Sequence, residues 1–288
     1  MKDDFVDVRI LDNFYQTSSF FPMPVVLVST VAESGQTNLG PYSLCFPYLV
    51  TGEHSMMLGT RGDSNTSLNI QRTGVCAINF IPDDKKYARN CVKLGFPGET
   101  TAEKMVNSIF TLLPSTRTAE QREPGIQYPE IVQEAIQVFE CTWDQRFPIR
   151  QDPESPECHF VLRIDRIVMK EKWRDRLFEG KGIPRLPVDY GFRNNAYFWF
   201  AKASRPYRVA IPEEKGVTVD EIRFAAQRVD PDMAWRDEAY AKLVRVPRVF
   251  LTRVIRQCIA MAREEGVTEI TPEFLDEIRD KRSKDRGR

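Results

Sequence analysis

Several features that mark particular classes of protein are missing from this 288-residue chain. Its 41 Lys and Arg residues are balanced by 41 Asp and Glu residues, so its net charge does not attract nucleic acid or an anionic membrane. No apolar run approaches the roughly 18–20 residues of a membrane-spanning helix. The opening stretch, MKDDFVDVRILDNF, is acidic where a secretory signal is basic. We therefore expect a cytoplasmic protein that binds neither nucleic acid nor membrane.

Side chains that bind metals are also scarce. The two histidines, His54 and His159, lie far apart in the sequence, and the six cysteines are scattered without a C-x-x-C pair. Structural zinc sites and iron–sulfur clusters are held by closely spaced ligands. We therefore expect no metal site, and we expect thiols that are reduced and mostly buried.

The residues that are present predict two domains. Hydrophobic residues make up 42% of the chain, and a chain of this length can bury a substantial core. Short β-branched runs occur up to about residue 211, and helical periodicity follows the polar linker PEEKG at residues 212–216. We expect a mainly β domain (α+β) over residues 1–211 and a small all-α domain over residues 217–288.

The first domain is predicted to be an antiparallel barrel. Its expected strands cover residues 24–31, 38–46, 55–60, 75–81, 134–144 and 158–170. Residues 65–73 are expected to form a short helix, with polar capping groups at its start and Gly74 as its stop. Strands joined mainly by short segments favour a barrel over a parallel, doubly wound sheet.

The second domain shows helix signals in succession. Thr218 and Glu221 have the spacing of a capping box, and Thr271-Pro272 is expected to open a last helix that ends near Asp280. Residues 248–265 are expected to form an amphipathic helix, with one apolar face made of Phe250, Val254, Cys258, Met261 and Ala262.

The stretch TRGDSNTSLNI, residues 60–70, is the best candidate for a binding site. Free N–H groups at the start of the predicted helix favour an anion, and Arg61 can make a forked contact with a phosphate group. Two interpretations remain open: a phosphate site, or a helix that Ser64 or Asn65 merely caps beside a solvated Arg61. Asp63 opposes an anion unless its carboxylate turns away or caps the helix.

The order of these segments resembles the flavin reductase-like family of FMN-binding split barrels, over about residues 20–200. In that family an Asn-x-x-Pro-x-Ser segment passes beside the flavin ring, and a Lys-Asp-Thr-x-x-Asn-Ile segment holds the phosphate. This chain keeps Asn38, Pro41, Ser43, Thr66, Asn69, Ile70, Gly74 and Asn79. It has Ser64-Asn65 where the family often has Lys-Asp, so Arg61 is the candidate replacement for the missing charge.

The resemblance implies an FMN-binding oxidoreductase of the flavin reductase type, in which NAD(P)H passes a hydride to the flavin and two copies form a homodimer. The backbone N–H groups of Tyr42, Ser43 and Leu44 would polarise the N5/O4 edge of the ring. His159 is the candidate catalytic residue, and its alternative is a hydrogen-bonded histidine on a barrel strand. The expected cofactor-binding residues are Asn38, Pro41, Tyr42, Ser43, Leu44, Thr60, Arg61, Ser64, Asn65, Thr66 and Asn79.

Two other functions stay open. One is an FMN-binding electron-transfer protein that a protein redox partner reduces, and the other is a non-catalytic scaffold that recruits partners through its helical tail. Residues 233–280 resemble the small C-terminal helical domain of the B subunit of light-independent protochlorophyllide reductase, although a glutamate of that family is Ala260 here. This domain either packs on itself or on the barrel, or recruits a redox partner or a tetrapyrrole-like substrate.

Overall fold

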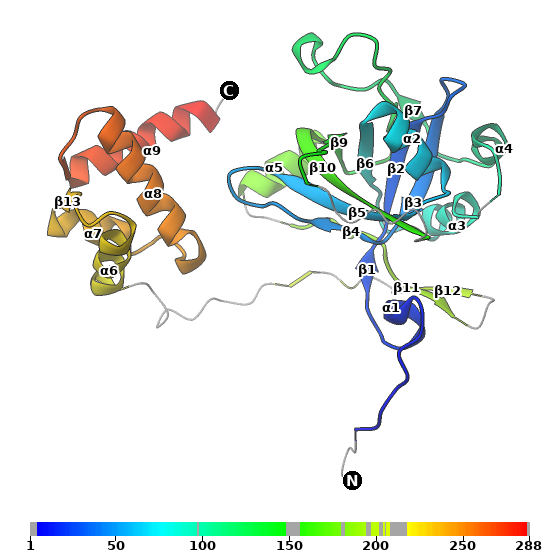
Figure 1. The fold of residues 1–288 in the computed structure, drawn as a ribbon, viewed down its shortest axis with the longest axis horizontal. Helices are drawn as coiled ribbons and strands as arrows, with labels where there is room; N and C mark the ends of the chain where they lie inside the picture. Colours follow the sequence, from blue (N-terminus) through cyan, green and yellow to red (C-terminus); the bar gives the residue numbers. More distant parts are fainter. Residues whose placement is uncertain are drawn as a thin grey trace. The chain divides into compact units, whose positions relative to one another are not determined.

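In the computed structural model the chain forms two compact units, Met1–Tyr207 and Arg208–Arg288 (Figure 1). The structure describes residues 5–96, 98–147, 156–179, 182–193, 197–201, 204, 206–207 and 218–286. The linker expected at residues 212–216 lies outside the described residues.

The first unit is built on a curled antiparallel sheet of seven strands, which forms a half-barrel (Figure 1). The order across the sheet is β3-β2-β6-β9-β10-β5-β4. The strands are β2 (Val26–Val31), β3 (Thr37–Tyr42), β4 (Cys45–Pro47), β5 (Ser55–Arg61), β6 (Val75–Phe80), β9 (Gln137–Trp143) and β10 (Glu157–Met169). The expected antiparallel arrangement is therefore confirmed.

Both faces of this sheet are covered, because β2 is buried along its whole length. Successive side chains of a strand point to opposite faces. Val26 and Val28 accordingly pack in one apolar core, while Leu27 packs in a second core together with Leu94 from helix α3 (Lys85–Leu94). The apolar residues at consecutive positions 25–28 reflect this burial on two sides.

Two runs that the sequence predicts as single strands are each divided. Residues 24–31 begin with Pro24, the last residue of β1 (Met23–Pro24), which pairs with β11 (Val188–Arg193) in a second sheet, and they continue into β2. Residues 38–46 contain β3 and β4, which pair with β2 and β5 respectively. These two strands are the opposite edges of the seven-stranded sheet. The chain must therefore leave one edge and join the other between Tyr42 and Cys45.

The helix expected at residues 65–73 is present as α2 (Asn65–Thr73). The Ser64 side chain accepts a hydrogen bond from the Ser67 N–H, and Gly74 ends the helix with φ 72°. The remaining elements of this unit are α1 (Phe14–Thr17), α4 (Thr101–Val106), β7 (Leu112–Leu113), a 3₁₀ turn (Ala119–Gln121), β8 (Ile131–Val132), α5 (Glu171–Glu179) and β12 (Tyr197–Ala201).

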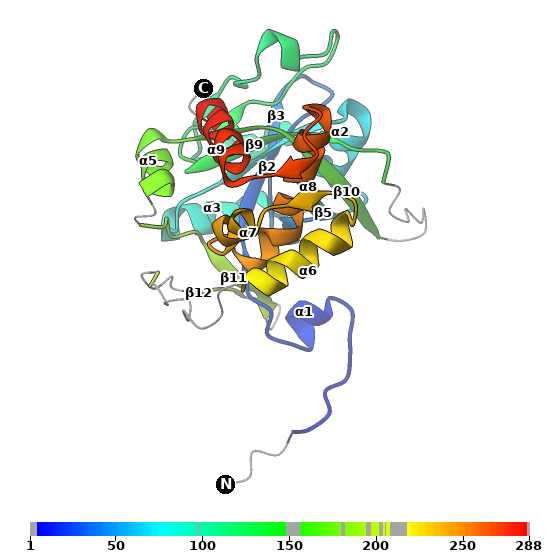
Figure 2. The same cartoon turned by 90° about the vertical axis from the view of Figure 1, so that its left-hand side faces the viewer.

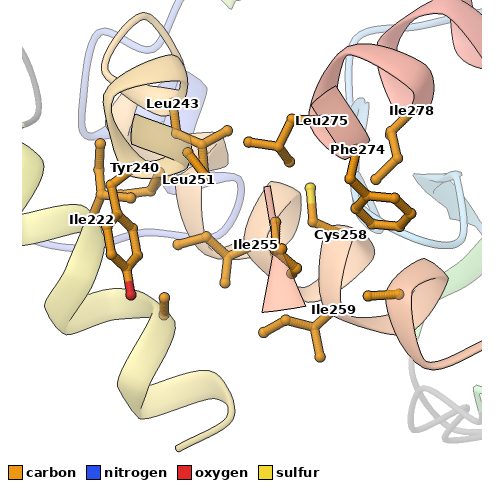
Figure 3. Close-up of a cluster of buried hydrophobic side chains, with 14 residues drawn as sticks. Ile222, Tyr240, Leu243, Leu251, Ile255, Cys258, Ile259, Phe274, Leu275 and Ile278 are labelled. Carbon is orange, nitrogen blue, oxygen red and sulfur yellow. The ribbon is translucent and has the colours of Figure 1, made fainter. Parts of the chain in front are cut away.

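The second unit packs four helices around its own core (Figures 2 and 3). Its elements are α6 (Val219–Val229), β13 (Ala234–Trp235), α7 (Asp237–Leu243), α8 (Arg248–Glu264), β14 (Glu269–Ile270) and α9 (Pro272–Arg286). The expected capping box is confirmed: the Glu221 N–H donates to Thr218 Oγ1 at 3.2 Å, and the Thr218 N–H donates to Glu221 Oε2 at 2.9 Å. Ile255 of α8 lies inside this core and is fully buried.

The buried face of α8 differs from the expected one. It consists of Leu251, Ile255, Cys258, Ile259 and Ala262. The expected places of Cys258 and Ala262 are confirmed, and Val254 and Met261 are partly buried against the same core. Phe250 is 50% exposed, so its predicted place on the buried face is wrong. One residue along a helix is a rotation of about 100°, and this turns Phe250 away once Leu251 occupies the core. The last helix also continues past Asp280, to Arg286.

All six cysteine thiols belong to described residues, and all six are buried and reduced, as expected. Burial raises the pKa of the Cys45 and Cys91 thiols to about 12. Within the described residues, no helix is long and apolar enough to cross a membrane.

Candidate functional site

A pocket of about 170 Å³ lies where β3, the end of β5 and the start of α2 come together. Six of the expected cofactor-binding residues line it: Pro41, Tyr42, Arg61, Ser64, Asn65 and Thr66. The other lining residues are Gly40, Asp63, Leu94, Gly95, Phe96, Gly98, Glu99 and Lys104. Residues that are distant in the sequence, from β3 to α4, thus share one concave surface.

The wall of the pocket depends on a close approach at Gly40. A Cβ atom at this position would lie 2.5 Å from Thr66 Oγ1 and 2.8 Å from the Tyr42 ring. Only glycine lets β3 come this near to the start of α2. Tyr42 adds a further link between the two elements, because its hydroxyl lies 3.2 Å from Ser64 Oγ as a hydrogen-bond donor.

The start of α2 presents hydrogen-bond donors at this pocket. Ser64 caps the helix through the Ser67 N–H, at 3.2 Å. The N–H groups of Asn65 and Thr66 precede the first intrahelical bonds and have no acceptor among the described residues. Such unpaired N–H groups, together with the positive end of the helix dipole, favour an anion.

Arg61 and Asp63 form an ion pair at the rim. Arg61 Nε donates to Asp63 Oδ1 at 3.2 Å, and the two side chains are 52% and 80% exposed. The Asp63 carboxylate therefore turns to its neighbouring arginine rather than capping the helix. The two terminal nitrogens of Arg61 keep their N–H donors for another acceptor.

Lys104 of α4 is a cation of the pocket that the sequence did not reveal. It is only 8% exposed, and its ammonium group has no hydrogen-bond or ion-pair partner in the part of the chain that the structure describes. Burial lowers the pKa of Lys104, as does the nearby Arg61 charge, whereas Glu99 raises it. A lysine beside a glutamate at the start of a helix usually indicates a solvated surface, so local sequence carried no signal of this burial.

Three of the expected cofactor-binding residues do not line the pocket, and their side chains are bonded to protein groups. Asn38 is fully buried, and its Nδ2 donates to Thr30 Oγ1 and Thr66 Oγ1, both at 3.4 Å. Asn79 is also fully buried; its Nδ2 donates to Ser29 Oγ at 2.7 Å, and its Oδ1 accepts the Val132 N–H at 2.8 Å. Thr60 Oγ1 donates to the Cys158 carbonyl oxygen at 3.2 Å. Asn38 supports Thr66 beneath the pocket wall.

Ser43, Leu44 and His159 lie outside the 170 Å³ pocket, on the chain that joins β3 to β4 and on the neighbouring β10. The Ser43 hydroxyl donates to Asp189 Oδ2 at 2.6 Å. His159 pairs with Gly59 across the strands, and a Cβ at Gly59 would meet both Leu44, at 3.3 Å, and the His159 ring, at 3.7 Å. His159 is 35% exposed, with Glu157 Oε2 3.9 Å from its Nε2.

The connection from β3 to β4 also supplies backbone donors. The N–H groups of Ser43 and Leu44 have no acceptor among the described residues, while the Leu44 carbonyl oxygen accepts the Gly59 N–H at 2.8 Å. This segment is therefore anchored on one side and has donors available on the other. Such donors are suited to the polar edge of a planar ligand.

Comparison with known proteins supports the fold. No protein-family model matches the chain, and no curated protein matches it. Solved structures do: flavoredoxin from Methanosarcina acetivorans has a TM-score of 0.51 at 16% identity, over 73% of this chain and 98% of that one. A split-barrel protein named as a candidate flavin reductase, from Shewanella frigidimarina, has a TM-score of 0.50 at 12% identity, over 69% of this chain and 90% of that one.

Component B of nitrilotriacetate monooxygenase from Bacillus cereus is also similar, with a TM-score of 0.49 at 21% identity over 72% of this chain and all of that one. Identities this low establish the fold alone. The curled seven-stranded sheet and its helices are those of the first two structures, so the first unit of this chain has the split-barrel fold of flavin reductase-like proteins.

Proposed function

We propose that the chain is a flavin-binding oxidoreductase of the flavin reductase type, which holds FMN and receives a hydride from NAD(P)H. The observation that carries the proposal is the donor-lined pocket at the start of α2, within a split-barrel fold. That pocket has the hydrogen-bond donors and the cations that a phosphate group requires. Asn65, Thr66 and Arg61 would hold the phosphate.

The segment from β3 to β4 would hold the ring of the flavin. The unpaired N–H groups of Ser43 and Leu44 would donate to its polar edge. When bound, a flavin supplies the hydride-accepting chemistry, and the protein supplies position and polarity. His159 lies across Gly59 from Leu44, which is where the hydride donor would meet the ring if the segment binds as proposed.

Other parts of the proposal concern assembly and location. We infer a homodimer, as the family resemblance implies, and we keep the cytoplasm as the proposed location. The helical unit would contact the barrel or a redox partner, and its resemblance to the protochlorophyllide reductase domain remains part of this proposal. Its separate apolar core supports a unit that packs by itself.

Absorption spectroscopy tests the proposal. The purified full chain is expected to be yellow or to bind added FMN, with a Kd measurable by fluorescence quenching. Anaerobic addition of NADH and of NADPH in separate cuvettes should bleach the flavin absorbance. A chain that binds no flavin under any of these conditions would contradict the proposal. A bound flavin that neither nucleotide reduces would instead favour an electron carrier that a protein partner reduces.

A further inference from the structure

We propose that Lys104 makes this pocket selective for a phosphorylated flavin, because its ammonium group is a second cation, in addition to Arg61, that meets the phosphate. The inference deepens the proposed function and rests on it. It assigns to a helix outside residues 59–70 the positive charge that Ser64-Asn65 lacks.

The first argument is the position of the Lys104 ammonium group, which has no hydrogen-bond acceptor among the described residues. Its side chain is more than nine-tenths buried and lines the pocket, yet within the described residues nothing accepts a hydrogen bond from it. The stem of Lys104 is buried, but its Nζ is not among the enclosed polar atoms that lack a hydrogen bond, so water in the pocket reaches the ammonium group. An anion in the pocket would supply the missing acceptor.

The second argument is the distribution of charge around the pocket. Two carboxylates, Asp63 and Glu99, are among the lining residues, but both belong to exposed side chains. Asp63 is already paired with Arg61. Charges at the rim are screened by water, whereas a charge in a buried wall acts through a lower effective dielectric. Lys104 is the least exposed of the charged residues that line the pocket.

The third argument is that Lys104 is held in place before any ligand arrives. A capping box fixes α4: the Glu103 N–H donates to Thr100 Oγ1 at 3.3 Å, and the Thr100 N–H donates to Glu103 Oε2 at 2.8 Å. Thr101 Oγ1 lies 3.4 Å from Asn38 Oδ1 as a donor, which ties α4 to β3. A cation held this way loses little freedom when it binds.

The ligand class follows from these groups together. The N–H groups of Asn65 and Thr66 come from α2, and the ammonium group comes from α4. Donors from separate elements, with a fixed cation among them, suit the several oxygens of a phosphate monoester. Riboflavin ends in a neutral hydroxyl group, which offers the cation only a weak acceptor, whereas FMN offers it the charged oxygens of a phosphate.

The test compares Lys104→Met with the wild-type full chain in titrations with FMN and with riboflavin. Losing a charged hydrogen bond should weaken FMN binding roughly 10- to 100-fold, while riboflavin affinity stays the same. Lys93→Met is the matched control, since Lys93 is exposed at the end of the neighbouring α3 and lies outside the pocket. It should leave both affinities unchanged.

A second measurement is the melting temperature of the ligand-free protein. Without flavin, Lys104→Met should melt close to the wild-type temperature, because the substitution removes a charged group that has no partner among the described residues and keeps an unbranched side chain that is one atom shorter. If Lys104→Met does not fold, the same titrations are made with Lys104→Gln. The ratio of the FMN affinity to the riboflavin affinity is also measured for the wild type. Equal affinity of the wild type for FMN and riboflavin, or full FMN affinity in the variant, overturns the inference and leaves the flavin proposal standing.

Inorganic phosphate separates the two proposals. If the wild type binds neither FMN nor riboflavin, the proposed function fails. The change in melting temperature on adding inorganic phosphate then tests whether Lys104 belongs to an anion-binding site. If phosphate raises the melting temperature of the wild type but not that of Lys104→Met, the anion-binding site at Lys104 is supported. If phosphate raises neither melting temperature, or raises both equally, an anion-binding site at Lys104 is excluded.

Discussion

Gly40→Ala is expected to destabilise the barrel, although alanine is normally preferred to glycine within a strand. The added Cβ would lie 2.5 Å from Thr66 Oγ1, about 1 Å inside an ordinary contact, and 2.8 Å from the Tyr42 ring. Overpacking of this kind costs about 1–3 kcal/mol, and the lower chain entropy of alanine offsets roughly 0.5–1 kcal/mol. We therefore expect a net loss of about 1–2 kcal/mol.

Gly59→Ala provides the matched comparison. Its Cβ would meet Leu44 Cβ at 3.3 Å, which needs a shift of only a few tenths of an ångström, so we expect the smaller loss. Thr66→Ala removes the closest atom that an alanine at position 40 would meet. The double variant Gly40→Ala/Thr66→Ala should then lose less than the sum of its single variants, by roughly 1 kcal/mol.

Urea unfolding measures these differences, provided that the two units are observed separately. Of the four tryptophans, Trp235 belongs to the helical unit, so a Trp235→Phe background restricts the fluorescence signal to the barrel. A Gly40→Ala barrel as stable as the wild type would refute the close approach of β3 to α2. Strict additivity in the double variant would refute the role of Thr66.

Three further outcomes are expected. Arg61→Ala should weaken FMN binding by roughly 1–3 kcal/mol in a fluorescence titration, and unchanged affinity would exclude a phosphate contact. Burial raises the pKa of Asp189, so the folded state keeps its proton to higher pH, and the contribution of Asp189 to barrel stability falls as pH rises above about 4. Asp189→Asn should therefore gain stability relative to wild type as pH rises from 4 to 7 in urea titrations, and a parallel pH profile would contradict this. Thr218→Ala should lower the stability of the helical unit by about 1 kcal/mol, seen in hydrogen exchange of α6, through loss of the bond from the Glu221 N–H; undiminished protection of those amides would argue against that cap.

Elements with strong local signals could be predicted from the sequence. The helix at residues 65–73 has a serine before it and a glycine after it, and both act as expected. The break between β3 and β4 could not be predicted, because nothing near Ser43 shows that the strands before and after it pair at opposite edges of the sheet.

The candidate site was predicted only as far as its residues are close in sequence. Ser64, Asn65 and Thr66 follow Arg61 directly and line the same pocket. Lys104 arrives through the packing of α4 against β3, a long-range contact that a single sequence does not encode in any local pattern. The place of Phe250 was mistaken for a similar reason, since several registers of an amphipathic stripe satisfy the same run of apolar residues.

The distribution of the buried thiols gives each unit its own chemical reporter. Five of the six cysteines belong to the barrel unit, and Cys258 alone belongs to the helical unit. A buried, protonated thiol reacts with an alkylating reagent only when its surroundings open. Mass spectrometry after pulsed alkylation would thus show one added group when the helical unit opens and up to five when the barrel opens. The native sequence therefore allows the opening of each unit to be timed within the same molecule, without a label or an engineered probe.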